Sequence, residues 1–383
     1  MNTIAENARQ QFAENFSGTP RLFFSPGRIN LIGEHVDYND GFVMPAAINK
    51  GVYYALAPNG TTTLNFIAMD FQERASFDLK DVAGSEGWKN YVLSVVNEFL
   101  LLKKNIGGFD CVFSGDIPRG SGMSSSAAVE GGLAYGINEM FNLGLDRVTL
   151  ALLCQRAEHN FPNVKCGIMD QFANMMGKNG HVILLDCQSI KHQYFPLKLD
   201  GYKIVLINTN VHHSLASGEY NIRRQRCEEG MSILKKRLSI HSFRELKESD
   251  VRDARDEMSE KVFNCCLFVV QEIERTQKAA ILLQSNDVQA FGKLMFEAHE
   301  GLSKLYEVSC KELDHLVEMA TKFDAVIGAR MMGGGFGGCT INLVKNEGIE
   351  SFVNAVTLDY QQKFHIIPEA YIVETGDGTH ELS

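Results

Sequence analysis

Apolar residues recur every three or four positions along several stretches of the chain, which is the spacing of one face of an α-helix. Such stretches dominate the second half of the sequence. Helices are predicted for residues 88–104, 124–141, 146–161, 219–238, 262–284, 287–309, 311–323 and 348–364. Short apolar runs bounded by turn residues predict strands instead. Strands are expected at residues 21–25, 108–118, 181–187, 203–209 and 370–375.

The order and number of these elements limit the possible fold classes. Strands and helices alternate irregularly, which is typical of an α+β or a mixed α/β protein. At roughly 100–200 residues per domain, a chain of 383 residues is expected to hold two domains. The composition shifts near residues 190–200, so we divide the chain into residues 1–195 and 196–383. Strand order does not follow from the sequence.

Charged side chains interrupt the apolar pattern most densely between residues 26 and 41, which read PGRINLIGEHVDYNDG. Arg28, Glu34, His35 and Asp37 share this segment with four aliphatic residues of the kind that fill a core. Charges are seldom buried unless they are paired or bind a ligand. The segment indicates a polar site built into the core, and the plainer alternative is a set of surface ion pairs with a structural histidine.

A glycine- and serine-rich segment, DIPRGSGMSSSAAVEGG at residues 116–132, joins a predicted strand to a predicted helix. Glycines allow a tight turn that brings backbone N–H groups close to a ligand, and a helix N-terminus adds unpaired N–H groups. Together these features favour phosphate binding. The segment is neither a Walker A loop nor a GxGxxG motif. A serine N-cap after a glycine turn is the structural alternative.

A second glycine-rich segment, GARMMGGGFGGCT at residues 328–340, has five glycines in the six positions from 333 to 338. Two interpretations are open. The residues alone favour a tight packing turn between a helix and a strand. The alternative is a second backbone wall at a ligand site.

The net charge and the cysteine content indicate which ligands and which cellular compartment to expect. The formal net charge is −10, which argues against a nucleic-acid-binding surface but not against anionic ligands, since local amides and metal ions bind these. No apolar run approaches the 18 residues needed to cross a bilayer, and no signal peptide is visible. Nine scattered cysteines without a CxxC pair fit a reducing compartment. We therefore expect a cytoplasmic protein.

Three motifs now stand in order along the chain, and two further segments accompany them. The three motifs resemble those of the galactokinase–homoserine kinase–mevalonate kinase–phosphomevalonate kinase (GHMP kinase) superfamily, and the first is similar to the galactokinase signature. The resemblance extends from about residue 20 to about residue 375. Five segments in order, at compatible spacing, make chance a poor explanation. The segments are residues 26–45, 118–130 and 330–339, with CGIMDQF at 166–172 and SGEYNIRRQRCEE at 217–229.

The resemblance implies a two-lobed α+β fold. The N-terminal lobe would resemble the second domain of ribosomal protein S5, and the C-terminal lobe would be ferredoxin-like with extra helices. ATP and a sugar would meet between the lobes, and the γ-phosphate of MgATP would pass to the C1 hydroxyl of α-D-galactose. The implied ligands are galactose, ATP and Mg²⁺. Neither nucleic acid nor a membrane is expected as a partner, and the chain is expected to be a monomer.

The resemblance also assigns roles at the reaction centre. Asp170 matches the catalytic aspartate that accepts the proton of the C1 hydroxyl, and Arg28 would stabilise the transferring phosphate. An arginine lowers the pKa of a neighbouring carboxyl and weakens it as a base, so Asp170 could act as a full base or mainly orient the hydroxyl. Carboxylates accept strong hydrogen bonds from sugar hydroxyls. The implied sugar-binding residues are Glu34, His35, Asp37 and Tyr220, with the backbone of Gly167.

For the nucleotide, the resemblance points to the serine loop and to Trp88, the only tryptophan. Mg²⁺ keeps several waters and needs few protein ligands; Ser126 and Glu158 match the metal positions. Without the resemblance, Glu158 would be interpreted as a solvated helix residue and Trp88 as core. Arg119 departs from many relatives, which have a smaller or uncharged residue there. The implied ATP-binding residues are Trp88, Gly120, Ser121, Gly122, Met123, Ser124, Ser125 and Ser126.

Two other functions remain open. A kinase of the same kind could act on N-acetylgalactosamine or arabinose, because the shape of the sugar pocket decides the substrate. A galactokinase-like sensor would bind galactose and ATP without catalysis. The known kind of sensor lacks a Ser-Ala pair in the serine loop, whereas SSSAA at 124–128 is intact here and Asp170 is present. This favours an enzyme.

Overall fold

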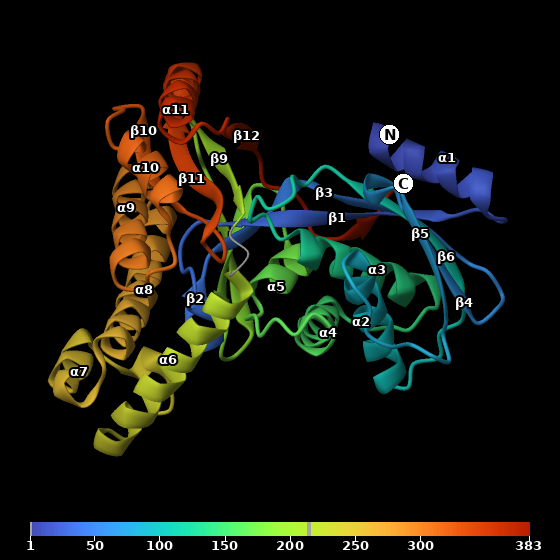
Figure 1. Cartoon of the computed structure of the whole chain (residues 1–383), viewed down its shortest axis with the longest axis horizontal. Coiled ribbons are helices and arrows are strands. Elements are labelled where there is room, and N and C mark those ends of the chain that lie inside the picture. The colour runs from blue at the N-terminus through green and yellow to red at the C-terminus, as the bar shows by residue number, and fades with distance from the viewer. Residues whose placement is uncertain (1, 213–215) are drawn as a thin grey trace.

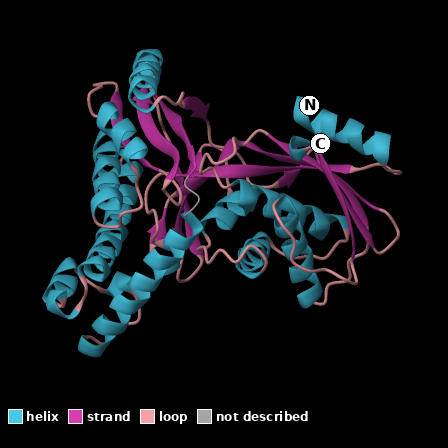
Figure 2. Ribbon diagram, in the orientation of Figure 1, coloured by secondary structure: helices cyan, strands magenta, loops and turns pink. Residues whose placement is uncertain are grey.

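The computed structural model describes residues 2–212 and 216–383. Its strands form sheets of six, four and three strands within those ranges, and helices cover them (Figures 1 and 2). The six-stranded sheet has the order β13-β1-β3-β6-β4-β5, antiparallel except for the β4–β6 pair. Its strands are β1 (Arg21–Asn30), β3 (Pro45–Pro58), β4 (Thr63–Ala68), β5 (Glu73–Asp78), β6 (Phe109–Gly115) and β13 (His380–Glu381).

Helices pack on both faces of this sheet. Side chains of a strand alternate between the faces, and neighbours in β1 show it. Leu22 packs with Ala8 and Phe12 of α1 (Thr3–Asn15), whereas Phe23 belongs to the large core under the other helices. Those helices lie together below the sheet in Figure 1. They are α2 (Trp88–Leu101), α3 (Ser125–Met140), α4 (Arg147–Asn160) and α5 (Met169–Met176).

The C-terminal half is built on an antiparallel sheet with the order β10-β11-β9-β12. Its strands are β9 (Tyr202–His212), β10 (Val326–Met331), β11 (Gly337–Lys345) and β12 (Glu369–Val373). A small sheet consists of β2 (Phe42–Val43), β7 (His181–Asp186) and β8 (Lys191–Pro196). The helices of this half are α6 (Ala216–Arg237), α7 (Glu248–Asp253), α8 (Glu260–Gln284), α9 (Val288–Lys304), α10 (Lys311–Ala320) and α11 (Ile349–Phe364).

The predicted helices and strands are present, with shifted ends. The strand expected at 21–25 continues to Asn30, with an irregular register between Pro26 and Arg28. The glycines at 333–338 link strand β10 to strand β11, so the expectation of a turn between a helix and a strand is wrong. Four of these five glycines have positive φ, a conformation that glycine adopts without strain.

The domain division at residue 196 remains a prediction. The C-terminal end of the chain returns to the N-terminal half, because β13 pairs with β1 in the six-stranded sheet and Glu381 lies opposite Phe23. The nearby Thr379 is fully buried and bonds to Asn174. No helix within the described ranges is long and apolar enough to cross a membrane.

A buried arginine, Arg330, links the N-terminal and C-terminal halves of the chain. Arg330 lies on β10, is fully buried, and is the largest fully buried side chain in the described residues. Its guanidinium donates to the backbone carbonyls of Asn30 and Leu31 at the end of β1. It also pairs with the buried Glu34 at 2.8 Å. Removing one member of a buried pair leaves the other charge uncompensated, which is strongly destabilising.

We predict that Arg330→Met lowers the free energy of unfolding by about 3–5 kcal/mol, because Glu34 and two carbonyls lose their donor. Urea unfolding followed by circular dichroism measures the change. Arg9→Met is the matched control, since the side chain of Arg9 is 52% exposed and pairs only with Glu6 on its own helix; it should shift stability by about 0.5 kcal/mol or less. Equal effects of the two variants would contradict the bridging role of Arg330.

Candidate active site

Arg28 and Asp170 form a two-pronged ion pair. Arg28 is buried in β1, and Asp170 lies in the first turn of α5. The guanidinium Nε is 2.8 Å from Oδ1 of Asp170, and Nη2 is 2.9 Å from Oδ2. Two parallel hydrogen bonds of this kind fix both side chains in direction as well as distance. The fold therefore joins two motifs that are 142 positions apart.

The glycine- and serine-rich loop closes over this pair. Arg28 donates through Nη1 to the carbonyl of Gly122, and its backbone N–H donates to the carbonyl of Met123 at 3.0 Å. Ser124 donates its hydroxyl to Asp170. Gly120, Gly122 and Ser124 have positive φ, so the loop turns sharply just before α3 begins at Ser125.

Two loop residues differ in what they offer a ligand. The Ser121 hydroxyl is buried and has no hydrogen-bond partner among the described residues, as expected of a group that waits for a polar ligand. The Met123 side chain is also buried but packs in an apolar cluster with Ile29 and Met332. Only the backbone of Met123 is therefore available to a nucleotide.

Glu34 and His35 face the second glycine-rich segment. Oε2 of Glu34 accepts from Arg330 at 2.8 Å and from the N–H of Gly333 at 3.0 Å. Nε2 of His35 lies 3.2 Å from the carbonyl of Gly334. Glycines 333 and 334 thus form a backbone wall beside the first motif, which was the alternative interpretation of this segment.

The contacts of His35 define its protonation. Because the Gly334 carbonyl can only accept, Nε2 carries the proton, and Nδ1 accepts from the Tyr38 hydroxyl at 2.8 Å. Burial lowers the pKa of His35 to about 4. The ring is therefore neutral at physiological pH and has its hydrogen bonds fixed. Tyr220 of α6 lies against it, with ring centroids 5.3 Å apart.

Asp37 sits against the start of α5. A Cβ on Gly167 would come within 2.0 Å of its Oδ2, so only glycine fits at 167. The backbone N–H of Met169 donates to the carboxylate. Burial, followed by the charges of Asp170 and Glu34, raises the pKa of Asp37 to about 7. Asp37, Asp170 and Glu34 therefore form one cluster of negative charge.

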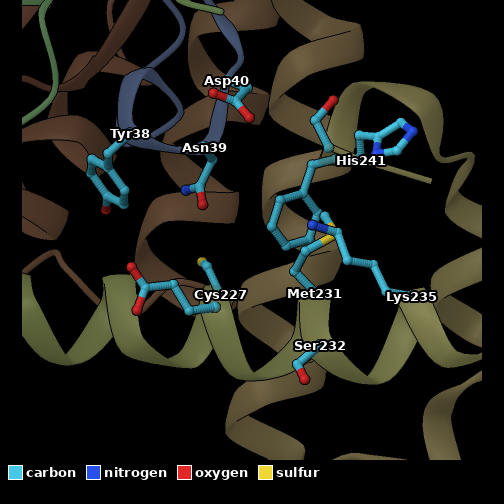
Figure 3. A pocket seen from close by; sticks show the side chains of 11 residues that line it. Tyr38, Asn39, Asp40, Cys227, Met231, Ser232, Lys235 and His241 are labelled. Carbon is cyan, nitrogen blue, oxygen red and sulfur yellow. The ribbon is translucent and has the colours of Figure 1, made fainter.

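A separate cavity of about 390 Å³ is lined by Tyr38 and its neighbours and by residues of α6 (Figure 3). In that view, Tyr38, Asn39 and Asp40 lie opposite Cys227 and Lys235 of α6. Tyr38 contacts both regions, because it lines this cavity and its hydroxyl bonds His35 at 2.8 Å. The same hydroxyl also bonds that of Tyr306 at 2.9 Å. Neither Arg28 nor Asp170 lines this cavity, so it is distinct from the reaction centre.

A larger cavity of about 600 Å³ borders the serine loop. Trp88 lines it and is fixed there, because its indole N–H donates to Glu73 at 3.0 Å. Trp88 is also 6% exposed and packs in the main core. Its side chain therefore belongs to the core and lines the cavity as well. The other lining residues are Val52, Asp70, Phe71, Gly87, Tyr91, Phe113, Gly115, Ile117, Arg119, Ser125, Ser126 and Val129.

Glu158 is a buried residue of α4 and not a solvated one. Its Oε2 accepts from the side-chain amide of Gln171 at 2.6 Å, and the Ser126 hydroxyl also bonds it. Burial, followed by the charge of Asp170, raises the pKa of Glu158 to about 7. A hydroxyl and a carboxylate side by side are the oxygen ligands that Mg²⁺ prefers. A cation there would offset the unfavourable burial of the carboxylate charge.

Sequence reasoning missed several residues of this region. Arg330 opens the third motif and Gln171 follows Asp170, so both stood inside quoted segments, yet nothing there assigned them a partner. Tyr38 lies within the first motif and was passed over for its charged neighbours. Phe71 and Tyr306 lie outside the five segments and carry no sequence signal for the site.

The lobes, the loop at a helix start and the Arg28–Asp170 pair define a class of protein, the GHMP kinases. Family models for the GHMP kinase N-terminal and C-terminal domains match residues 90–178 and 279–360. A crystal structure of mevalonate kinase shares the fold with a TM-score of 0.66 at 18% identity, over 92% of this chain and 98% of that chain. The predicted two-lobed GHMP kinase fold is confirmed.

Within this class, the galactose-binding signature of galactokinases matches residues 10–58. The galactokinase of Clostridium acetobutylicum is 40% identical over 100% of this chain and 99% of that protein. The galactokinase of Bacillus subtilis is 39% identical over 94% of each. The Lactococcus lactis galactokinase, solved in complex with galactose, is 34% identical with a TM-score of 0.96, over 99% of this chain and all of that one. The chain belongs to the galactokinase family of ATP-dependent sugar kinases.

We predict that Glu158→Gln stabilises the ligand-free protein at high pH. The folded state, with a pKa of about 7, holds the proton of Glu158 more tightly than the unfolded state, near 4.5. Ionising this residue therefore lowers stability progressively between those two pH values. The variant should be more stable than the wild type by roughly 2–3 kcal/mol at pH 8 and equal to it at pH 4.

Urea unfolding at the two pH values, without metal or nucleotide, measures this difference. Glu86→Gln is the matched control, because Glu86 is exposed and should show no such pH dependence. A Glu158→Gln protein that is less stable than the wild type at pH 8 would contradict the assignment of a strained, buried carboxylate.

Proposed function

We propose that the chain transfers the γ-phosphate of MgATP to the C1 hydroxyl of α-D-galactose, giving galactose 1-phosphate and ADP. The observation that carries the proposal is the Arg28–Asp170 pair, held at 2.8 Å beside the serine loop and next to the cluster formed by Glu34, His35 and Asp37. Similarity to a galactokinase solved with galactose supports the choice of sugar.

The sugar would bind through polar groups held in fixed positions by the first motif and the start of α5. Asp37 and Glu34 offer carboxylate acceptors, and the ring of Tyr220 closes the site from the C-terminal half. The backbone at Gly167 is bare and close to Asp37, so a hydroxyl can approach there without a side chain in the way. A site that leaves such groups unpaired when a hydroxyl is missing rejects the wrong sugar strongly.

Asp170 would orient the C1 hydroxyl and take its proton as the new O–P bond forms. Both of its oxygens already accept hydrogen bonds from Arg28, and Ser124 bonds one of them as well. These bonds hold the carboxylate in position to receive the hydroxyl proton. The hydroxyl oxygen becomes acidic as it begins to bond to phosphorus, and its proton would then pass to Asp170.

Arg28 and the loop would stabilise the transferred phosphate. The C1 oxygen attacks the γ-phosphorus, and the bond to the bridging oxygen of ADP breaks. Negative charge is spread over the phosphoryl oxygens in such transfers, and Arg28 is the nearest fixed cation to Asp170. The backbone of residues 120–123 and the hydroxyls of Ser121 and Ser125 would cradle the phosphates. Mg²⁺ held by Ser126 and Glu158 would neutralise charge on the ATP phosphates.

Three further expectations remain proposals. We propose that the chain acts as a monomer. A cytoplasmic location is supported by nine free cysteines, seven of them buried, as in proteins of reducing compartments. The division near residue 196 is supported by the two family domains that match on either side of it.

We predict that kcat/KM for galactose, measured as ADP release, is at least about tenfold higher than for N-acetylgalactosamine or arabinose. Each sugar hydroxyl that does not match the site leaves a buried protein group without its hydrogen-bond partner. A coupled assay for ADP with each sugar, and without sugar, measures this. A higher value for either other sugar would assign the chain to that substrate. Sugar binding without turnover would mark it as a sensor, and either result would contradict the proposal.

We predict that Asp170→Asn lowers kcat by about 10²–10⁴-fold, the usual contribution of a catalytic base, while ATP affinity changes little. Asp40→Asn is the matched control. Asp40 lies in the first motif but lines the separate cavity, and its φ of 60° is one that asparagine also adopts. The control should keep at least half of wild-type kcat. Near-normal turnover of Asp170→Asn would remove Asp170 from the reaction.

A further inference from the structure

An arginine and a phenylalanine stack at the rim of the 600 Å³ cavity. The guanidinium carbon of Arg119 lies 4.1 Å from the ring centroid of Phe71. Its Nη2 also donates to the backbone carbonyl of Asp70 at 2.8 Å. Arg119 is exposed, so these two contacts, and not burial, define where its charge sits.

The platform under Arg119 is itself fixed. Phe71 ends the short 3₁₀ helix η2 (Met69–Phe71). The Asp70 carboxylate accepts from the Ser114 hydroxyl at 2.6 Å and from the N–H of Gly115 at 2.8 Å, which fastens η2 to the end of β6. The Phe71 ring also lies against Trp88, with centroids 6.4 Å apart. The stack Arg119–Phe71–Trp88 is thus anchored to the sheet.

The charge of Arg119 has no counter-ion among the residues that the structure describes. Both of its contacts are with uncharged groups, and within the described ranges no carboxylate forms an ion pair with it. Stacking uses the face of the guanidinium and leaves N–H donors at its edge, which match phosphate oxygens well. Phe71 is 41% exposed, one of the few large apolar residues that are.

We propose that Arg119 binds the polyphosphate chain of the nucleotide at the cavity rim, and that the Phe71 ring holds its guanidinium in place. Arg119 directly precedes the phosphate loop and lines the same cavity as Trp88, Ser125 and Ser126, so its charge borders the space that the nucleotide would fill. The inference rests on the proposed function, because it takes the nucleotide to occupy this cavity.

The position of Arg119 assigns it to nucleotide affinity and not to the chemical step. Arg28, and not Arg119, holds Asp170. A contact made equally in the ground state and the transition state changes KM and leaves kcat nearly constant. An exposed guanidinium is also screened by salt. Loss of Arg119 should therefore act on phosphate-bearing ligands, most strongly at low ionic strength.

Isothermal titration calorimetry of the full chain with MgATP, MgADP and adenosine tests this, with Arg119→Gln and Arg119→Lys as variants. Arg119→Gln should lower the affinity for MgATP and for MgADP about tenfold, and the affinity for adenosine less than twofold. In a kinase assay it should raise KM for ATP about tenfold, with less than a twofold change in kcat. Arg119→Lys should recover part of the affinity, because charge remains but the stack is poorer. Arg74→Gln, an exposed arginine on β5 outside the cavity, should match the wild type.

Each other result has a defined meaning. Unchanged MgATP affinity in Arg119→Gln would overturn the inference alone, provided that the wild type binds MgATP. An equal loss for adenosine and MgATP would also overturn it, because the side chain would then act on the base and not on the phosphates. A wild type that binds no MgATP would overturn the proposed function, and the inference with it.

Discussion

The contact between Arg28 and Asp170 constrains the site more than any other. A guanidinium and a carboxylate with two parallel hydrogen bonds tolerate little displacement, and here the two groups belong to a strand and to a helix start. The phosphate loop is bound to the same pair through Gly122 and Ser124. Three segments distant in sequence therefore share one geometry, and a shift in any of them moves the reacting groups.

The site also concentrates charge in a way that opposes folding. Burial raises the pKa values of Asp37 and Glu158 to about 7. Burial, followed by the charge of Glu158, also raises the pKa of the nearby Glu130 well above its usual value. Groups kept in unfavourable surroundings are common at functional sites, where the surrounding structure holds them in place. Arg330 supplies part of that support by pairing with Glu34 across the two halves.

Much of the fold could be predicted from the sequence because its signals are local. Helical spacing predicted α2, α3 and α4, and in the C-terminal half α6, α8, α9, α10 and α11, within a few residues, whereas α1, α5 and α7 were not predicted. The strands β3, β4 and β5 were missed, since β3 is almost wholly buried and lacks an alternating pattern, while β4 and β5 are short. Strand order and the return of β13 to the first sheet depend on contacts between residues far apart, and no local pattern encodes these.

The site, like the fold, has features that the sequence predicts and features that depend on contacts between distant residues. The family resemblance grouped Arg28, Asp170, Glu158 and the serine loop, and the structure brings them together. Partnerships such as Arg330 with Glu34, or Arg119 with Phe71, were not predictable, because either partner alone is an ordinary residue of a strand or a loop. The Met123 side chain shows the converse case, since a residue inside a functional motif serves the core.

A crystal structure with galactose, Mg²⁺ and a non-hydrolysable ATP analogue tests the central claim most directly. The measured quantity is the distance from the C1 oxygen of the sugar to the Asp170 carboxylate and to the γ-phosphorus. We expect the C1 oxygen within about 3 Å of Asp170, about 3–3.5 Å from the phosphorus, with Arg28 beside the γ-phosphate. A sugar bound with C1 turned away from Asp170, or a γ-phosphate remote from Arg28, would contradict the account.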